Sequence, residues 1–225
     1  MNMNTMKFDL HVHSCYSSDC DSKIDDILKH SEMNGLDGVA ICDHNTIDGS
    51  IKAIERAEEL GSEVIVIPSI EVSSLGGHIL ILGIYENIKP KLTVDETISK
   101  ARELGGTIII PHPFKRSSHG LGYIHGIDID AIEVINSRCL NNFANKKAQT
   151  ESGKLNIPGV GGSDAHIPEM IGRAYTEINT KDKDVDSILN SIKDGKVQAG
   201  GSLTPSSYVL RQIYANMKKA IVNEK

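Results

Sequence analysis

The sequence predicts an α/β fold with a mainly parallel sheet, and three observations carry this prediction. Short runs rich in Ile and Val recur along most of the chain and are apolar on both alternating faces, as in strands buried on both sides. Segments with helical spacing of apolar residues separate most of these runs, which is the pattern of β-α-β units. In a chain of 225 residues, about six or seven such strands favour a barrel over an open sheet, although periodicity alone leaves closure undecided.

Seven apolar runs are predicted to be strands. They are residues 8–13, 38–44, 63–73, 78–84, 107–113, 131–136 and 160–164. Only the short segment SLGG separates the third run from the fourth. A parallel crossover needs a dozen or more residues, so these two runs are predicted to form an antiparallel hairpin.

The helices are predicted from apolar spacing and from their end signals. Ser22 is a predicted N-cap of a first helix that ends at Gly35, and a second helix spans 48–60. Thr93 and Glu96 have the spacing of a capping box at the start of a third helix.

The chain is expected to form one barrel domain, 1–181, with a C-terminal helical extension, 182–225, packed on it. Within the extension we expect a helix near 184–194, a link rich in Gly, Ser and Pro at 200–207, and a last helix near 207–222. The last helix carries one apolar stripe, formed by Val209, Ile213, Met217 and Ala220. This stripe is expected to pack on the barrel, with a homodimer contact as the alternative.

Composition narrows the range of partners. The net charge is −6, aromatic residues make up 4% of the chain and Trp is absent, which argues against extended nucleic acid as a partner. A small phosphorylated compound remains open. No apolar stretch reaches the roughly 18 residues that span a bilayer, and the N-terminus lacks the pattern of a secretory signal. We therefore expect a cytoplasmic protein that does not bind a membrane.

Residues that bind metals recur at the ends of the predicted strands. The segment DLHVHSCYSSD contains a His-x-His pair, but composition alone would give roughly 0.4 such pairs, so the pair is weak evidence by itself. The full set is His11, His13, Asp19, Asp43, His44, Glu71, His78, His112, Asp164 and His166. In α/β folds the loops at the carboxyl ends of the strands converge on one mouth. So many charged and imidazole groups are costly to bury together unless cations bind them, which predicts a metal centre.

These motifs resemble those of the PHP (polymerase and histidinol phosphatase) family of metal-dependent phosphoesterases. The similarity lies in DLHVHSCYSSD, CDHNT, PSIEVS with GHILILG, PHPF and GGSDAH, and it extends from residue 9 to about 176. The resemblance implies a distorted (β/α)7 barrel with two or three divalent transition metals at the C-terminal rim of the strands.

The resemblance also implies three sets of metal ligands. They are His11, His13, Glu71 and Asp164 for the first metal; Glu71, His78 and His112 for the second; and Asp19, His44 and His166 for the third. Mixed imidazole and carboxylate ligands suit zinc, manganese or iron, and the sequence does not choose among them.

The implied reaction is hydrolysis of a small phosphomonoester, such as a nucleotide or histidinol phosphate. The attacking group would be a hydroxide that bridges two metals and is held by Glu71. Asp43 is expected to orient the metal ligands without binding a metal itself. His119 is a candidate acid for the leaving group.

Four cations are candidate substrate-binding residues: Lys115, Arg116, Arg138 and Arg173. Specificity is expected to lie in two loops, 114–126 and 137–157. The alternatives are a phosphodiesterase or exonuclease-like activity on nucleic acid ends and a noncatalytic module that metals stabilise.

Overall fold

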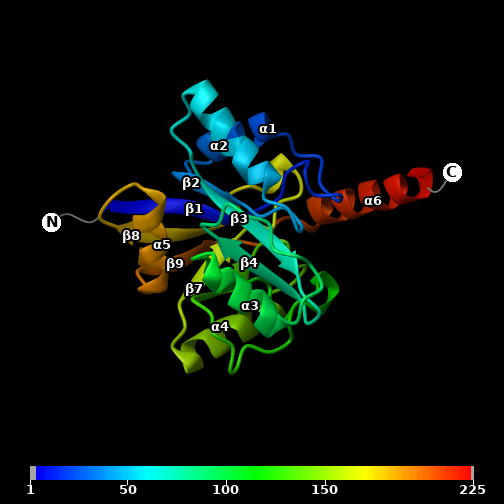
Figure 1. The fold of residues 1–225 in the computed structure, drawn as a ribbon. Helices are drawn as coiled ribbons and strands as arrows, with labels where there is room; N and C mark the ends of the chain where they lie inside the picture. Colours follow the sequence, from blue (N-terminus) through cyan, green and yellow to red (C-terminus); the bar gives the residue numbers. More distant parts are fainter. Residues whose placement is uncertain (1–3, 224–225) are drawn as a thin grey trace.

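The computed structural model describes residues 4–223, which form one strongly curved sheet surrounded by helices (Figure 1). The nine strands follow the order β7-β6-β5-β4-β3-β2-β1-β8-β9. Their bounds are β1 Asn4–Val12, β2 Gly38–Ile41, β3 Ile65–Ser73, β4 His78–Leu82, β5 Thr107–Ile110, β6 Ala131–Asn136, β7 Gly159–Gly162, β8 Ala174–Thr180 and β9 Val197–Gly201. The predicted α/β class is therefore confirmed, with nine strands rather than seven.

The sheet nearly closes into a barrel where β1 meets β7. The Asp164 N–H donates to the His11 carbonyl at 2.8 Å, and the His13 N–H donates to the Ala165 carbonyl at 2.9 Å. On β8 the Thr176 hydroxyl accepts from the main chain of Gly161 and donates back to it. These contacts join β7, at one end of the strand order, to β1 and β8 near the other end, so the carboxyl ends of the parallel strands share one rim.

The predicted hairpin is confirmed. β3 and β4 pair in antiparallel register, with Ser73 opposite His78. β4 is also antiparallel to β5, whereas the pairs β1–β2, β2–β3, β5–β6 and β6–β7 are parallel. Because β4 runs in the opposite direction, His78 at its start lies at the same rim as the end of β3.

Six α-helices accompany the sheet. Their bounds are α1 Ile24–Met33, α2 Asp48–Leu60, α3 Val94–Glu103, α4 Phe143–Leu155, α5 Val185–Lys193 and α6 Ser206–Asn223. The capping box of Thr93 and Glu96 is present at the start of α3. The prediction for Ser22 was wrong, because Lys23 occupies the N-cap of α1 and makes no side-chain capping bond. No helix in the described range is both long and apolar enough to cross a membrane.

Three segments differ from their predictions. Helix α4 lies within the expected loop 137–157, and its sequence FANKKAQTESGKL has few apolar residues to reveal it. The expected link at 200–207 begins inside β9, a short Gly-rich strand. Strand β8 was missed because AYTEINT alternates between buried and half-buried positions instead of forming an apolar run.

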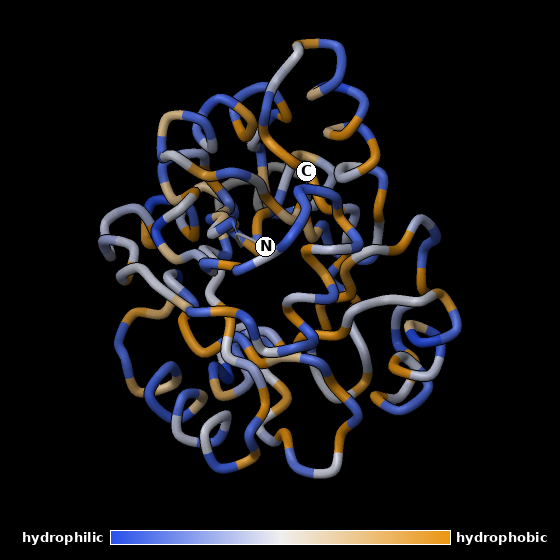
Figure 2. Tube along the Cα trace, turned by 90° about the vertical axis from the view of Figure 1, so that its left-hand side faces the viewer, coloured by the Kyte–Doolittle hydropathy of each residue, from blue (hydrophilic) through white to orange (hydrophobic). Residues whose placement is uncertain are grey.

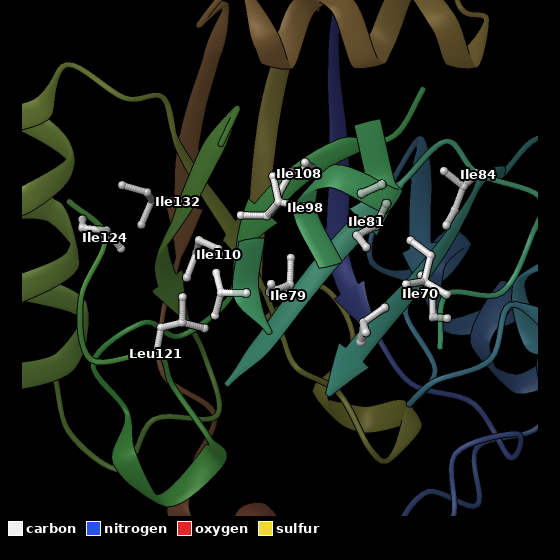
Figure 3. Packing of buried hydrophobic residues seen from close by; sticks show 14 of the residues in the cluster. Ile70, Ile79, Ile81, Ile84, Ile98, Ile108, Ile110, Leu121, Ile124 and Ile132 are labelled. Carbon is white, nitrogen blue, oxygen red and sulfur yellow. The ribbon is translucent and has the colours of Figure 1, made fainter. Parts of the chain in front are cut away.

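The apolar core has an inner cluster and two outer clusters, one of which packs β1 to β3 against α1, α2 and Val209 of α6. The inner cluster takes residues from β1 to β8 and includes Phe8, Leu10 and Leu80, with Ile188 and Ile192 of α5 packed against it. The other outer cluster lies between the strands β3 to β6 and the helices α3 and α4 (Figure 3). Figure 2 shows that the outer turns of the surrounding helices are largely hydrophilic. The core therefore fixes the strands while their carboxyl ends remain available for polar groups.

Gly162 on β7 is a position of the barrel at which a side chain has no room. A Cβ added there would lie 2.5 Å from the Cβ of His11 and 2.7 Å from Oε1 of Glu133. We expect Gly162→Ala to lower the free energy of unfolding by about 1–3 kcal/mol, the usual cost of overpacking. Urea unfolding followed by circular dichroism measures the change.

Gly153→Ala in α4 is the matched control, because a Cβ at Gly153 meets nothing within 4 Å. Alanine there should raise the free energy of unfolding by roughly 0.5–1 kcal/mol, since glycine weakens a helix interior. Equal stability of the Gly162→Ala variant and the unsubstituted protein would contradict the packing described for β7.

Candidate metal centre

All nine predicted ligands gather at the rim of the barrel, around a cavity of about 410 Å³. Seven of them line this cavity, namely Asp19, His44, Glu71, His78, His112, Asp164 and His166. His11 and His13, at the end of β1, are completely buried beneath it. Side chains from β1, β3, β4 and four strand-end loops therefore meet in one place.

Glu71 lies at the centre of this cluster, and only 1% of the residue is exposed. Its Oε1 is 2.9 Å from Nδ1 of His78 and 3.2 Å from Nε2 of His112. Its Oε2 is 2.9 Å from Nδ1 of His44 and 3.6 Å from Nε2 of His13. One carboxylate therefore contacts imidazoles from both sides of the cavity, as a group shared between metals would.

The other two carboxylates, Asp164 and Asp19, both contact His166. Oδ1 of Asp164 is 3.7 Å from Nε2 of His13 and 3.4 Å from Nδ1 of His166. Oδ2 of Asp19 is 3.0 Å from Nε2 of His166, and its Oδ1 is 3.6 Å from Nε2 of His44. Asp164 and Asp19 thus each lie beside histidines of their predicted ligand sets.

Four groups of three side chains have ligand atoms that all lie within 4.8 Å of one another. They are His13, His44 and His166; His11, Glu71 and His112; His11, His13 and Asp164; and His44, Glu71 and His78.

Several buried atoms of the cluster have no hydrogen-bond partner among the described residues. They are Oδ1 of Asp19, Nδ1 of His44 and Nδ1 of His112. Nδ1 of His44 is 2.9 Å from Oε2 of Glu71 but lacks the alignment of a hydrogen bond. Buried polar atoms are rarely left unpaired, and imidazoles mixed with carboxylates form a donor set for divalent transition metals. The residues therefore fit a metal centre.

The charges of the cluster favour cation binding. Burial raises the pKa of the Glu71 carboxyl, but the imidazoles of His78 and His44 outweigh this effect and hold the pKa well below its usual range. Burial likewise raises the pKa of Asp164, and Arg138 and Lys115 more than offset it, so the pKa is lowered. Both carboxylates are consequently ionised at neutral pH.

The pKa values of two histidines shift in opposite directions. Burial and then the neighbouring imidazole of His166 lower the pKa of His13 well below its usual value, so that its ring is neutral. Burial also lowers the pKa of His44, but Glu71 and Asp19 outweigh it and raise that pKa to about 10. A metal that binds His44 must displace a proton, so metal binding and proton release are linked here.

Several residues at the rim have strained backbone conformations, which set the directions of their side chains. His112, His119 and Asp164 have φ values of 30°, 54° and 54°, and Asn45 has 61°. Residues other than glycine rarely adopt this left-handed region, and the cost is usually found at functional sites. The surrounding strands hold these conformations in place.

Glu133 on β6 belongs to the site, although the sequence did not identify it. Its Oε1 is 3.0 Å from Nδ1 of His11, and its Oε2 accepts a hydrogen bond from the His112 N–H at 2.7 Å. It therefore fixes the orientation of one predicted ligand and the backbone of another. The available signal was a single acidic residue inside the apolar run AIEVIN.

Asp43 lies behind the cluster. Its Oδ1 accepts from the Ser17 hydroxyl at 2.7 Å, and that hydroxyl is 3.2 Å from Nδ1 of His13. The same hydroxyl accepts from the His44 N–H at 3.0 Å. Asp43 thus acts on two predicted ligands through Ser17.

Of the four candidate cations, two lie beside Asp164 and two are exposed. Nη1 of Arg138 lies 3.7 Å from Oδ1 of Asp164, and Nζ of Lys115 lies 3.4 Å from Oδ2 of the same residue. Arg116 and Arg173 are exposed and do not line the described cavity.

The candidate acid also reaches the cavity. His119 is part of the cavity wall, where its ring stacks on His78 with centroids 5.1 Å apart.

Residues 142–197 match the PHP-associated family model. An uncharacterized protein of Methanocaldococcus jannaschii is 35% identical over 161 residues, which cover 65% of this chain and 93% of that protein. A second uncharacterized protein of that organism is 30% identical over 94% of this chain and 91% of its own length. A 5'-3' exoribonuclease of Haemophilus influenzae is 34% identical over 90 residues, 40% of this chain and 32% of that protein.

Solved structures share the fold. A two-domain protein of Bacteroides vulgatus, which contains a predicted PHP-like metal-dependent phosphoesterase, superposes with a TM-score of 0.75 at 18% identity, covering 95% of this chain and 70% of that one. The lesion-specific endonuclease EndoQ of Pyrococcus furiosus superposes with a TM-score of 0.64 at 19% identity, over 87% and 58%. The fold is that of PHP-like metal-dependent phosphoesterases. This chain belongs to the PHP family.

We expect Glu133→Gln to weaken metal binding by about 10–100-fold, the usual effect of removing a partner of a ligating histidine. The amide keeps the shape of the side chain but removes the negative charge that faces His11. Competition with a chromophoric chelator measures the affinity.

Glu151→Gln is the control, because Glu151 lies on α4 and pairs with Lys154 and His125. Its affinity for metal should equal that of the unsubstituted protein. Unchanged affinity in the Glu133→Gln variant would contradict a role for Glu133 in the site.

Proposed function

We propose that this protein is a metal-dependent phosphatase that hydrolyses a small phosphomonoester, such as a nucleotide or histidinol phosphate. The observation that carries the proposal is Glu71, a buried carboxylate surrounded by imidazoles at the floor of an open cavity. A structural metal needs one closed site, whereas this cluster offers several overlapping groups of ligands beside an open cavity. That arrangement supports catalysis over a purely structural role.

The ligand sets of the proposal are those implied by the family resemblance, with Glu71 shared between the first and the second. Two or three divalent ions would occupy them, and zinc, manganese and iron all suit the donors. Bound metals would lower the pKa of the attacking water and stabilise negative charge on the phosphoryl oxygens.

The side chains of the rim have separate tasks in this reaction. Arg138 and Lys115 bind phosphoryl oxygens, since each lies more than 3.3 Å from its carboxylate partner and can turn toward a substrate. Nε of Arg138 also has no hydrogen-bond partner among the described residues. His119, at the wall of the cavity, holds the proton that the leaving oxygen takes up.

The remainder of the cavity supports a small and polar substrate. Beyond the predicted ligands it is lined by Ser18, Asn45, Ser73, Ser117, Ser118, His119 and Arg138. This described lining contains no Phe, Tyr or Trp on which a base could stack. The net charge of −6 also disfavours a long polyanion.

A second candidate is cleavage of phosphodiesters at nucleic acid ends. The endonuclease of Pyrococcus furiosus has a similar fold, and the exoribonuclease of Haemophilus influenzae shares sequence over part of the chain. The proposed metal centre fits either reaction, because the same metal chemistry serves phosphomonoesters and phosphodiesters.

A substrate screen decides between the two candidates. The metal-reconstituted protein is tested on a panel of phosphomonoesters, dinucleotides and short oligonucleotides, with released phosphate and shortened products measured separately. We expect release of phosphate from monoesters. Shortening of oligonucleotides without release from monoesters would establish the alternative instead.

Glu71→Gln tests the shared carboxylate. We expect two or three transition metals per chain in the unsubstituted protein and fewer in the variant, with hydrolysis reduced by about 10³-fold or more, because several kcal/mol of transition-state stabilisation is lost. Elemental analysis and the phosphatase assay measure the two effects.

Glu55→Gln, at an exposed ion pair with Lys52 on α2, is the control. Circular dichroism checks that both variants are folded. Full activity of the Glu71→Gln variant, or one metal or none in the unsubstituted protein, would contradict the proposed centre.

A further inference from the structure

Helix α6 reaches the rim of the cavity through two side-chain amides one turn apart. Nδ2 of Asn216 donates to the main-chain carbonyl of Asp19 at 2.8 Å, and Nε2 of Gln212 donates to the same oxygen at 3.3 Å. Oε1 of Gln212 accepts from Nη2 of Arg138 at 2.8 Å. The helix therefore contacts a proposed metal ligand and a proposed phosphate-binding residue.

The orientation of α6 is unusual for a helix that is held by packing. Gln212 is only 4% exposed, whereas Leu210, Tyr214 and Met217 are 57%, 68% and 61% exposed. An amphipathic surface helix normally buries its apolar stripe. In α6 both Gln212 and Val209 meet the body, whereas Ile213 and Met217 are exposed, so the expected packing of the apolar stripe is found at Val209 and not at those two residues. Val209 of that stripe is buried, and Ala220 lies outside the described side chains.

Both the oxygen and the nitrogen of the buried Gln212 amide form hydrogen bonds. A buried amide without hydrogen-bond partners costs roughly 1–3 kcal/mol. The two groups that Gln212 contacts offset this cost. One of these groups is the main chain of a turn, and the other is a guanidinium beside Asp164. This side chain thus links two parts of the site that arise from distant segments of the chain.

The start of α6 is anchored separately from these amides. The Thr204 N–H donates to the Ser137 carbonyl at 2.7 Å, and the two hydroxyls of these residues lie 2.8 Å apart. Nη2 of Arg211 pairs with Oε1 of Glu169 at 2.7 Å. Loss of one amide should therefore leave the helix attached.

We propose that Gln212 and Asn216 are positioning residues of the phosphoesterase site, an inference that rests on the proposed function. Their amides hold the Asp19 turn so that its carboxylate reaches His166 and His44. Gln212 also orients the guanidinium of Arg138 toward the phosphoryl oxygens. The described hydrogen bonds of the two amides go to the main chain of Asp19 and to the guanidinium of Arg138, so each amide acts through the residue it holds.

Metal retention tests the contact with Asp19. Gln212→Met and Asn216→Leu keep the approximate size of each side chain and remove its hydrogen bonds. Both variants should lose the metal of the set Asp19, His44 and His166 at about tenfold lower chelator concentration than the unsubstituted protein, as expected for an indirect contact. Elemental analysis after dialysis against graded chelator measures this loss, with no need for turnover.

The kinetic constants test the contact with Arg138. At saturating metal, Gln212→Met should raise KM and weaken inhibition by inorganic phosphate about tenfold, the value of one hydrogen bond to a charged group. Asn216→Leu should leave KM and phosphate inhibition unchanged, because its described hydrogen bond goes to Asp19. A merely structural role would change both variants alike.

Arg211→Ala is the matched control on the same helix, since it removes an anchor whose partner Glu169 lies outside the site. Metal retention and KM should both stay at the values of the unsubstituted protein. An equal loss in Arg211→Ala would show that detachment of α6 explains the effect, and it would overturn the inference.

The outcomes separate this inference from the proposed function. If the unsubstituted protein holds metals and hydrolyses esters while both amide variants match it, the inference is wrong and the proposed function stands. If the protein holds metals but hydrolyses no ester, the proposed function is wrong, and metal retention still decides the role of the amides. A protein that binds no metal contradicts both.

Discussion

The burial of one carboxylate is the constraint on which the rest of this structure depends. Glu71 is almost fully enclosed, and an isolated carboxylate in such a place would cost several kcal/mol. The compensation comes from imidazoles on neighbouring segments. His78 reaches it because β3 and β4 form a tight hairpin, and His44 reaches it through the parallel bridge between their two residues. The hairpin is therefore part of the sheet and also brings an imidazole to the buried carboxylate.

Closure of the barrel serves the same constraint. The backbone bonds between His11 and Asp164 bring the first and last parallel strands together, and the two side chains then belong to one group of possible metal ligands. Gly162 allows this approach because no Cβ intervenes between β7 and His11. The left-handed conformations of His112 and Asp164 carry strain that the strands beside them must hold. Packing of the core is what makes these unfavourable conformations stable at the rim.

Much of the fold and the gathering of the site residues could be predicted from the sequence, because the relevant signals are local. Parallel strands buried on both faces leave Ile- and Val-rich runs, and SLGG is too short for a crossover, so the place of His78 followed from chain length alone. Strand β8 has no such run, since one of its faces is half-buried. Glu133 could not be recognised, because its partner His11 lies 122 positions away and nothing near AIEVIN indicates it.

In the C-terminal helix, the spacing of apolar residues did not predict which side chains are buried, and the reason is physical. Among the described side chains the predicted stripe is buried only at Val209, and α6 and the segment leading into it also meet the body through amide, hydroxyl and ion-pair contacts. Such bonds each contribute roughly 1 kcal/mol net, far less than a buried helix face. In the described part of α6, Val209 and Tyr208 add to the apolar core, whereas Gln212 and Asn216 contact the rim through hydrogen bonds. In our proposal, the position of Asp19 depends on hydrogen bonds from α6, whereas Glu71 lies on β3 and is paired with His78 through the β3–β4 hairpin.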